Sequence, residues 1–441
     1  MSTSVRMRWF LAPVLLCLWL LAQAQTIVVN IRQGVTNPTP IAIVPFGYEG
    51  TSAAPFDVSG LIERDLANSG YFDPMAHGDM VSRPTQRGQL NLTDWRIVDV
   101  DYVLFGRVLQ QPGSRYRIEY FLYDVVRGEP LIEEWMEGVV SDELRRKSHQ
   151  IADKVYAEIT GIPGIFDTRI AYVTEERRSV DDRTFRLIVA DADGENATAI
   201  AQSSQPLMSP SWSPDGRRIA YVSFESEEQS AIYVQTVSTG NRERVSARPG
   251  NNQSPAWSPD GRRLAVVLSI DNGNFDIFML DLSSQVLTRL TSNSAIDTEP
   301  QWSPDGRYIY FTSGRGGTTQ IYRVEAEQGA RAERVTYEGR YNARPTLSPD
   351  GEQLAMIHRD AQGRDRIAIL DLNNDFLDVL SGGSLDESPS FAPNGAMIIY
   401  ATKNRGQAVL AAVSSDGRVQ QDINSAAGDV SNPVWGPLRL P

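Results

Sequence analysis

Cysteine is almost absent from this chain, since Cys17 is the only one in 441 residues. It lies in an apolar stretch, residues 9–21, that follows Arg6 and Arg8 and precedes Ala22-Gln23-Ala24. Such a pattern is typical of a secretory signal peptide, and the stretch is shorter than the about 20 residues that span a membrane. We therefore predict cleavage after Ala24, and a mature chain without a transmembrane segment, a disulfide or a thiolate metal site.

Basic residues are outnumbered by acidic ones, with 42 Lys and Arg against 55 Asp and Glu, for a net charge of −13. The predicted signal peptide carries two of the arginines and no acid, so the mature chain is more acidic still. Nucleic-acid binding needs clustered cations that face phosphates. This charge excludes nucleic acid as a partner and favours a basic or neutral one.

Catalytic motifs are also missing. The three histidines, His77, His149 and His358, are far apart in sequence, and we expect His149 to be an ordinary residue on a helix surface. The nearest approach to a G-x-S-x-G nucleophile motif is residues 382–386, which has an acid in place of the second glycine. Residues 191–194 resemble the start of a calcium loop, but a turn between strands explains them better. We predict no enzyme activity, no cofactor and no metal site.

A repeated pattern fills the second half of the chain. Its clearest copy is Ser-Pro-Ser-Trp-Ser-Pro-Asp-Gly at residues 209–216, and the sixth copy stops at the C-terminus. The leading prolines recur every 44 or 45 residues, the period of four-stranded propeller blades. They stand at Pro210, Pro255, Pro300, Pro345, Pro389 and Pro433.

Each repeat predicts four short antiparallel strands. In the second copy, Ser258-Pro259-Asp260-Gly261 separates two β-prone runs and has the residues of a type I hairpin turn with a left-handed glycine. The third strand recurs six times, so we predict six blades. The first unit, from Ile170, has no Pro-x-Trp strand before it, and the last such strand has nothing after it, so the C-terminal strand should close the first blade.

A large apolar residue follows each leading proline by two positions. We expect these side chains to pack between neighbouring blades and to act as core residues, not as ligand contacts. They are Trp212, Trp257, Trp302, Leu347, Phe391 and Trp435.

A smaller domain precedes the propeller. We expect a buried strand at residues 41–44, a helix at 57–68, a three-stranded meander between residues 102 and 139, and a helix capped by Ser141 that runs to Thr160. These elements indicate a compact α/β domain. The predicted organisation is a signal peptide at 1–24, an N-terminal tail at 25–40, the α/β domain at 41–163 and the six-bladed β-propeller at 164–441.

This combination resembles the TolB family of the periplasmic Tol-Pal system of Gram-negative bacteria. The resemblance is carried by the signal peptide, the segments at 43–46 and 68–72 of the front domain, the segment at 205–210 and the six W-S-P-D-G-type repeats. It implies a periplasmic scaffold that bridges the lipoprotein Pal and the inner-membrane protein TolA. The implied role is outer-membrane integrity and invagination during cell division, with other outer-membrane proteins and the translocation segments of imported toxins as further partners.

The resemblance also implies two binding regions. The tail after the signal peptide would bind TolA, as an extended segment able to add to a partner's sheet; its residues are Gln25, Thr26, Ile27, Val28, Val29, Asn30 and Ile31. The propeller would bind Pal. Because alternate connections of a blade lie on opposite faces, the variable loops before the Pro-x-Trp strands should surround one mouth of the channel. Variable loops on a rigid scaffold are where partners commonly bind. The predicted mouth residues are Met208, Ser209, Asn251, Asn252, Ser254, Thr298, Glu299, Arg344, Glu387 and Asn432.

Two other functions remain open. A propeller hydrolase or lyase could act on envelope saccharide or peptide in the channel, although the sequence identifies no convergent acid and base. A sensor of small ligands could also use a channel of this kind.

Overall fold

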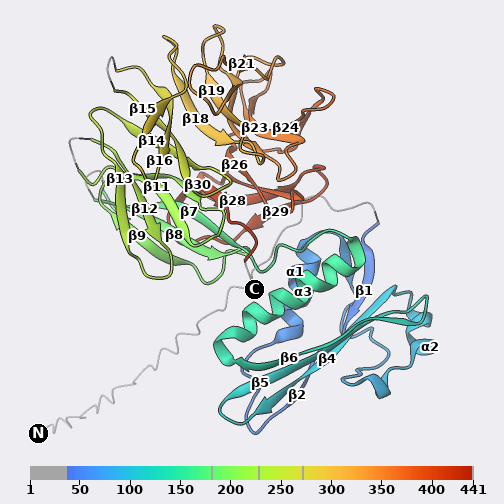
Figure 1. Cartoon of the computed structure of the whole chain (residues 1–441). Helices are drawn as coiled ribbons and strands as arrows, with labels where there is room; N and C mark the ends of the chain where they lie inside the picture. Colours follow the sequence, from blue (N-terminus) through green and yellow to red (C-terminus); the bar gives the residue numbers. More distant parts are fainter. Residues whose placement is uncertain (1–36, 180–181, 227–228, 271–272, 440–441) are drawn as a thin grey trace, which may run out of the picture.

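A computed structural model describes residues 37–179, 182–226, 229–270 and 273–439 and shows two domains (Figure 1). An α/β domain comes first, and a six-bladed β-propeller follows it. The fold class predicted from the sequence is therefore confirmed. The predicted signal peptide and tail residues 25–36 lie outside the described residues.

The front domain is built on one mixed sheet with strand order β3-β1-β4-β5-β6, in which β2 also pairs with β4. The expected helix at 57–68 is confirmed as α1, and its N-cap Asp57 accepts a hydrogen bond from the backbone N–H of Gly60 (2.9 Å). The strands are β1 (Thr39–Ile43), β2 (Gly47–Glu49), β3 (Phe72–Pro74), β4 (Tyr102–Gln111), β5 (Arg115–Asp124) and β6 (Glu129–Val140), and the helices are α1 (Val58–Asn68), η1 (Arg87–Gln89), α2 (Leu92–Trp95), η2 (Arg96–Val98), η3 (Ser141–Glu143) and α3 (Leu144–Thr160).

Both faces of this sheet are covered. Alternate residues of β1 point to opposite sides, so Ile41 and Ile43 pack under α1 and α3, whereas Ala42 and Val44 pack with Trp95 on the other face. The strands β2 and β3 and the short helices were not expected from the sequence. The prediction that Ser141 caps the last helix is wrong: Ser141 begins a 3₁₀ turn, and the Glu143 side chain accepts the Val140 N–H (3.4 Å) instead.

Six four-stranded antiparallel sheets form the propeller, which confirms the predicted blade number. We number the blades from the strand that carries Pro210. They are blade 1 with β10 (Leu207–Trp212), β11 (Arg218–Ser223), β12 (Ala231–Thr236) and β13 (Arg242–Ser246); blade 2 with β14 (Asn252–Trp257), β15 (Arg263–Leu268), β16 (Asp276–Asp281) and β17 (Leu287–Arg289); blade 3 with β18 (Asp297–Trp302), β19 (Tyr308–Ser313), β20 (Gln320–Glu325) and β21 (Glu333–Arg334); blade 4 with β22 (Asn342–Leu347), β23 (Gln353–Arg359), β24 (Asp365–Asp371) and β25 (Leu377–Val379); blade 5 with β26 (Glu387–Phe391), β27 (Met397–Asn404), β28 (Gln407–Ser414) and β29 (Gln420–Ile423); and blade 6 with β30 (Asp429–Trp435), β7 (Arg169–Arg177), β8 (Arg183–Asp191) and β9 (Thr198–Ser203).

The chain's last strand closes blade 6. Antiparallel pairing joins Val430 to Thr174, Val434 to Ala171 and Trp435 to Ile170, so β30 is the innermost strand of the blade that β7 begins. The predicted closure by the C-terminus is confirmed. Because β30 pairs with β7, the closed ring leaves only short, protected strand edges among the described residues.

The repeated turn has the predicted chemistry. In blade 2 the N–H of Gly261 donates to the Ser258 carbonyl (2.9 Å), and Gly261 has a φ of 68°. The Ser258 hydroxyl donates to Asp260 (2.5 Å) and accepts the Arg263 N–H (2.9 Å), which ties the turn to the strand that follows it. The role of the Pro-Asp-Gly sequence is therefore structural: it forms the turn between the first two strands of the blade.

The repeated aromatic residues pack between blades, as predicted. Trp257 is 6% exposed and contacts apolar residues of β11 in blade 1 and of β15 in its own blade. The guanidinium of Arg218, also from blade 1, lies 4.6 Å from the centre of its ring. Such a cation–π contact adds about 0.5–2 kcal/mol to the burial term. Arg169 on Trp212 and Arg263 on Trp302 repeat this arrangement at 4.9 Å.

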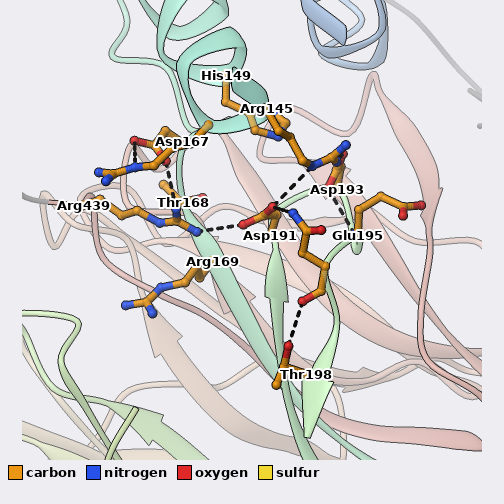
Figure 2. Close-up of polar contacts among 12 residues, drawn as sticks. Arg145, His149, Asp167, Thr168, Arg169, Asp191, Asp193, Glu195, Thr198 and Arg439 are labelled. Carbon is orange, nitrogen blue, oxygen red and sulfur yellow. Dashed lines mark hydrogen bonds and ion pairs between the residues drawn. The ribbon is translucent and has the colours of Figure 1, made fainter. Parts of the chain in front are cut away.

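The front domain lies beside the propeller in Figure 1, and it contacts the propeller face that carries the Pro-Asp-Gly turns, called the turn face below. The side-chain amide of Asn394, in the fifth copy of this turn, donates to the Pro163 carbonyl (2.7 Å). Arg439, just after β30, pairs with Asp167 in the interdomain join (3.1 Å) and with Asp191 at the end of β8 (2.8 Å), as Figure 2 shows in part. These contacts fix the front domain on the side opposite the loops that lead into the innermost strands.

Candidate partner-binding site

A β-bulge interrupts all six innermost strands at the residue before the leading proline. In β10, Met208 pairs with Val222 and Ser211 with Ala220, so β10 has one residue more than β11 between these pairs. The extra residue takes a left-handed conformation, with a φ between 48° and 57° in the six strands. The six bulge residues are Ser209, Ser254, Glu299, Arg344, Ser388 and Asn432.

This conformation is strained for residues other than glycine, at a cost of about 1–2 kcal/mol each, and the residue before a proline ordinarily stays extended. Six repetitions of one strained geometry around a channel indicate a constraint on where these side chains point. The bulge residues and their prolines line a central cavity of about 460 Å³.

Polar contacts connect bulge residues of adjacent blades. The Glu299 carboxylate accepts the Arg344 backbone N–H (3.0 Å), Arg344 Nε (2.9 Å) and the Thr312 hydroxyl (2.8 Å). Arg344 Nη1 in turn donates to the Ser388 hydroxyl, so one network spans blades 3, 4 and 5. Between blades 6 and 1, the Ser209 N–H donates to Asn432 Oδ1 (2.8 Å). The ring therefore presents a charge pair on one side of the channel and small polar groups on the other.

The loops that lead into the innermost strands are held by buried polar residues at the start of four of these strands. Asn252, Asp297, Asn342 and Asp386 are each 0% exposed. Asn252 Oδ1 accepts the Ser246 hydroxyl (2.7 Å), and Asp386 accepts the hydroxyls of Ser381 and Thr402 (2.5 Å each). Because buried polar groups must find partners, these contacts fix the loops in one conformation.

The anchor of blade 4 contains a histidine. Asn342 donates to the Gln320 side chain (2.9 Å) and to the Glu338 carbonyl (2.8 Å), and its Oδ1 accepts from His358 Nδ1 (2.8 Å). Burial lowers the pKa of His358, which favours the neutral imidazole with its proton on Nδ1. The loop before β22 therefore has a fixed geometry at neutral pH.

Exposed apolar side chains surround the same mouth of the channel. One lies near the start of an innermost strand and three lie in the loops before such strands. They are Met208 (39% exposed), Ile296 (56%), Tyr337 (73%) and Leu385 (39%). Apolar side chains rimmed by polar groups are typical of protein-binding surfaces. We call the loops that lead into the innermost strands, together with the bulge residues, the loop mouth.

The predicted mouth residues fall into three groups. Ser209, Ser254, Glu299, Arg344 and Asn432 are bulge residues; Met208, Thr298 and Glu387 immediately precede bulge residues; and Asn251 and Asn252 lie in the loop before Ser254. Asn252 is buried, so any part it has in binding is to hold the loop. The predicted tail residues 25–31 lie outside the described residues.

Sequence reasoning missed four residues of the loop mouth. Ser388 occupies the bulge of a degraded repeat, and its spacing before Pro389 could have identified it. Ile296, Tyr337 and Leu385 lie in loops that do not repeat, where isolated apolar residues among polar ones were the only signal.

No helix in the described part of the chain has the length and apolar character needed to cross a membrane.

The sequence and the fold are similar to those of known proteins. A family model described as the TolB beta propeller domain matches residues 156–439, and one described as the TolB amino-terminal domain matches residues 27–131. Two proteins named Tol-Pal system protein TolB, from Xanthomonas euvesicatoria pv. vesicatoria and Xanthomonas axonopodis pv. citri, are each 48% identical to this chain over 98% of both chains. The crystal structure of TolB from Acinetobacter baumannii is 37% identical, with a TM-score of 0.85, and the match covers 93% of this chain and 99% of that one.

Proposed function

The chain belongs to the TolB family of Tol-Pal system proteins, and we propose that it is a periplasmic scaffold that binds the lipoprotein Pal through its loop mouth and TolA through its N-terminal tail. In this role it supports outer-membrane integrity and the invagination of that membrane during division. The observation that carries the proposal is the rigid, partly apolar loop mouth on the face away from the front domain.

Three features support the loop mouth as the Pal surface. Its loops are held by buried anchors, so a partner does not have to order them on binding. Exposed Tyr337 and Ile296 provide apolar contact area, and tyrosine is enriched among the residues that dominate binding energy. The Glu299–Arg344 pair supplies charges of both signs at 25% and 28% side-chain exposure.

The channel supports binding more than catalysis. Among the described residues that line it, Glu299 is the only carboxylate, and there is no histidine. The Glu299 carboxylate is already engaged by Arg344 and Thr312. A hydrolase or lyase of saccharide or peptide would require a second acid or base near it.

The TolA proposal rests on the tail and its place in the chain. Residues 26–30 are β-prone and precede β1 of the front domain. A strand of this kind can add to the open edge of a partner's sheet through main-chain hydrogen bonds. Because the loop mouth belongs to the propeller, the two partners would be bound by different domains of one protein.

Replacing Glu299 with lysine is expected to weaken Pal binding by at least about 10-fold, which corresponds to about 1.4 kcal/mol. The change places a cation beside Arg344 and removes the acceptor of three hydrogen bonds, so both side chains leave their positions in the ring. Calorimetric titration of Pal into the mature protein measures the effect.

Glu327→Lys is the matched control. Glu327 is exposed, belongs to the same blade and lies in the turn between β20 and β21, on the turn face. The Glu327→Lys substitution changes the charge by the same amount as Glu299→Lys, but at a site away from the loop mouth. It should leave the affinity for Pal unchanged. Wild-type affinity in folded Glu299→Lys protein would contradict the proposed location.

A further inference from the structure

A cavity of about 680 Å³ lies between the front domain and the turn face of the propeller. The front domain contributes Asp65 from α1 and His149 and Tyr156 from α3, and the propeller contributes Asp193, Glu195 and Met397. Side chains from both domains therefore line one cavity.

His149 is the unexpected member of this wall. The prediction of an ordinary residue on a helix surface is wrong, because the side chain is buried between α1 and α3 and the residue is 2% exposed. Its Nδ1 pairs with Asp65 Oδ2 at 2.7 Å, and Asp65 is itself 4% exposed. This pair joins residues 84 positions apart and holds the imidazole in one orientation.

The other ring nitrogen, His149 Nε2, is buried without a hydrogen-bond partner among the described residues. A buried polar atom without a partner destabilises the fold, so its presence in a lined cavity calls for an occupant. An imidazole whose Nδ1 is fixed by a carboxylate and whose Nε2 is free has the arrangement of metal-binding histidines.

A carboxylate of the propeller lies next to this pair. Asp193 belongs to the turn between β8 and β9, where Figure 2 shows it beside Glu195 and the guanidinium of Arg145. One ligand atom each from Asp65, His149 and Asp193 lie within 4.8 Å of one another. A tetrahedral ion with bonds of about 2.0–2.2 Å needs ligand atoms about 3.4 Å apart, so binding would draw these side chains closer together and would loosen Asp193 from Arg145.

The local charge favours a cation. Asp193 accepts Arg145 Nη2 and Arg439 pairs with Asp191, while Arg64 also lines the cavity, so its acids are partly neutralised by arginines. The acids of this cluster are Asp65, Asp191, Asp193 and Glu195.

We propose that His149 Nε2 and the Asp193 carboxylate bind a divalent transition-metal ion of the Zn²⁺ class, with Asp65 orienting the imidazole through Nδ1. Imidazole and carboxylate ligands suit zinc, and water in the cavity can fill the remaining positions. The ion links α3 of the front domain to the β8–β9 turn of the propeller and so fastens the two domains together. This site is independent of the partner-binding function proposed above.

The test is a calorimetric titration of Zn²⁺ into the mature protein after removal of metals with EDTA. The expected result is one ion bound per chain, with affinity reduced at least about 10-fold in both His149→Gln and Asp193→Asn. Zn²⁺ should also raise the Tm of the wild type and of neither variant. His77→Gln is the control, because His77 is a half-exposed front-domain histidine that pairs with Glu63 outside the cavity.

Asp193→Asn keeps the test decisive if His149→Gln fails to fold, since Asp193 lies in a surface turn with 23% of its side chain exposed. The proposal is overturned if the wild type binds no Zn²⁺ below about 100 µM. It is also overturned if a folded Asp193→Asn protein binds the ion as tightly as the wild type.

Discussion

A chain that ends at Gly428 is expected to lose the folded propeller. The truncation removes β30, the innermost strand of blade 6, and exposes the edge of β7 along the whole register from Ile170 to Glu175. It also removes the packing of β30 against β26 on one side and β10 on the other. A ring that is opened at one blade loses contacts in three blades at once.

The size of the effect follows from burial. Val430 and Trp435 are 1% and 7% exposed, and Val434 packs against the neighbouring cluster. At about 1.5–3 kcal/mol for each fully buried large apolar side chain, Val430 and Trp435 contribute about 3–6 kcal/mol, and the partly buried Val434 and the strand hydrogen bonds add to this. Because whole domains are stable by about 5–15 kcal/mol, the truncated chain should show no cooperative propeller transition by calorimetry and should aggregate.

A chain with the sequence of β10, Leu207–Trp212, in place of residues 430–435 is the matched control. β10 has the same bulge, proline and tryptophan, leucine replaces the buried Val430, and serine replaces only the partly buried Val434, so the ring should close. This control should unfold within several degrees of the wild type. A truncated chain with an unchanged cooperative transition would show that the C-terminal strand does not hold the ring together.

Deletion of residues 25–34 is expected to abolish TolA binding, with almost no change in Tm. The predicted docking strand is removed, whereas β1 begins only at Thr39 and the described core of the front domain is intact. Calorimetric titration of the periplasmic part of TolA measures the first effect, and thermal unfolding the second.

A variant in which a Gly/Ser segment of equal length replaces residues 25–34 separates sequence from length. It should fail to bind TolA as the deletion does, because glycine and serine form a poor strand and carry no apolar side chains. If either variant still bound TolA, the tail would not be the TolA-binding segment.

The propeller could be predicted in detail because its signals are local and repeated. The turn at residues 258–261 depends only on its own four residues, and Trp257 identifies the interior side of its strand. Closure by Trp435 followed from the two incomplete ends of the repeat. A pattern of this kind needs no knowledge of contacts between distant parts of the chain.

The bulges could not be predicted in the same way. Serine, glutamate, arginine and asparagine occupy the six positions; of these only asparagine favours a left-handed conformation, and the residue before a proline is ordinarily extended. The geometry arises because an extra residue must be accommodated where the innermost strands converge. The family resemblance indicated the correct region of the chain, but the Glu299–Arg344–Ser388 network depends on contacts between blades.

Contacts between the domains were also beyond the sequence. His149 lies on the helix that was correctly predicted to run to Thr160, yet its burial depends on how α1 packs against α3. Asp193 was correctly assigned to a turn, but its place beside Arg145 depends on the front domain resting on the turn face. The sequence does not indicate an interdomain role for either residue, because the partner of each is far away in sequence.

Hydrogen exchange of the mature protein, with and without saturating Pal, locates the Pal surface. Pal is expected to slow exchange in the loop mouth, in peptides that cover residues 205–209, 248–254, 292–299, 337–344 and 382–388. Exchange in the Pro-Asp-Gly turns should change little. Protection confined to the turn face or the front domain, or no binding of Pal at all, would contradict the proposed Pal surface.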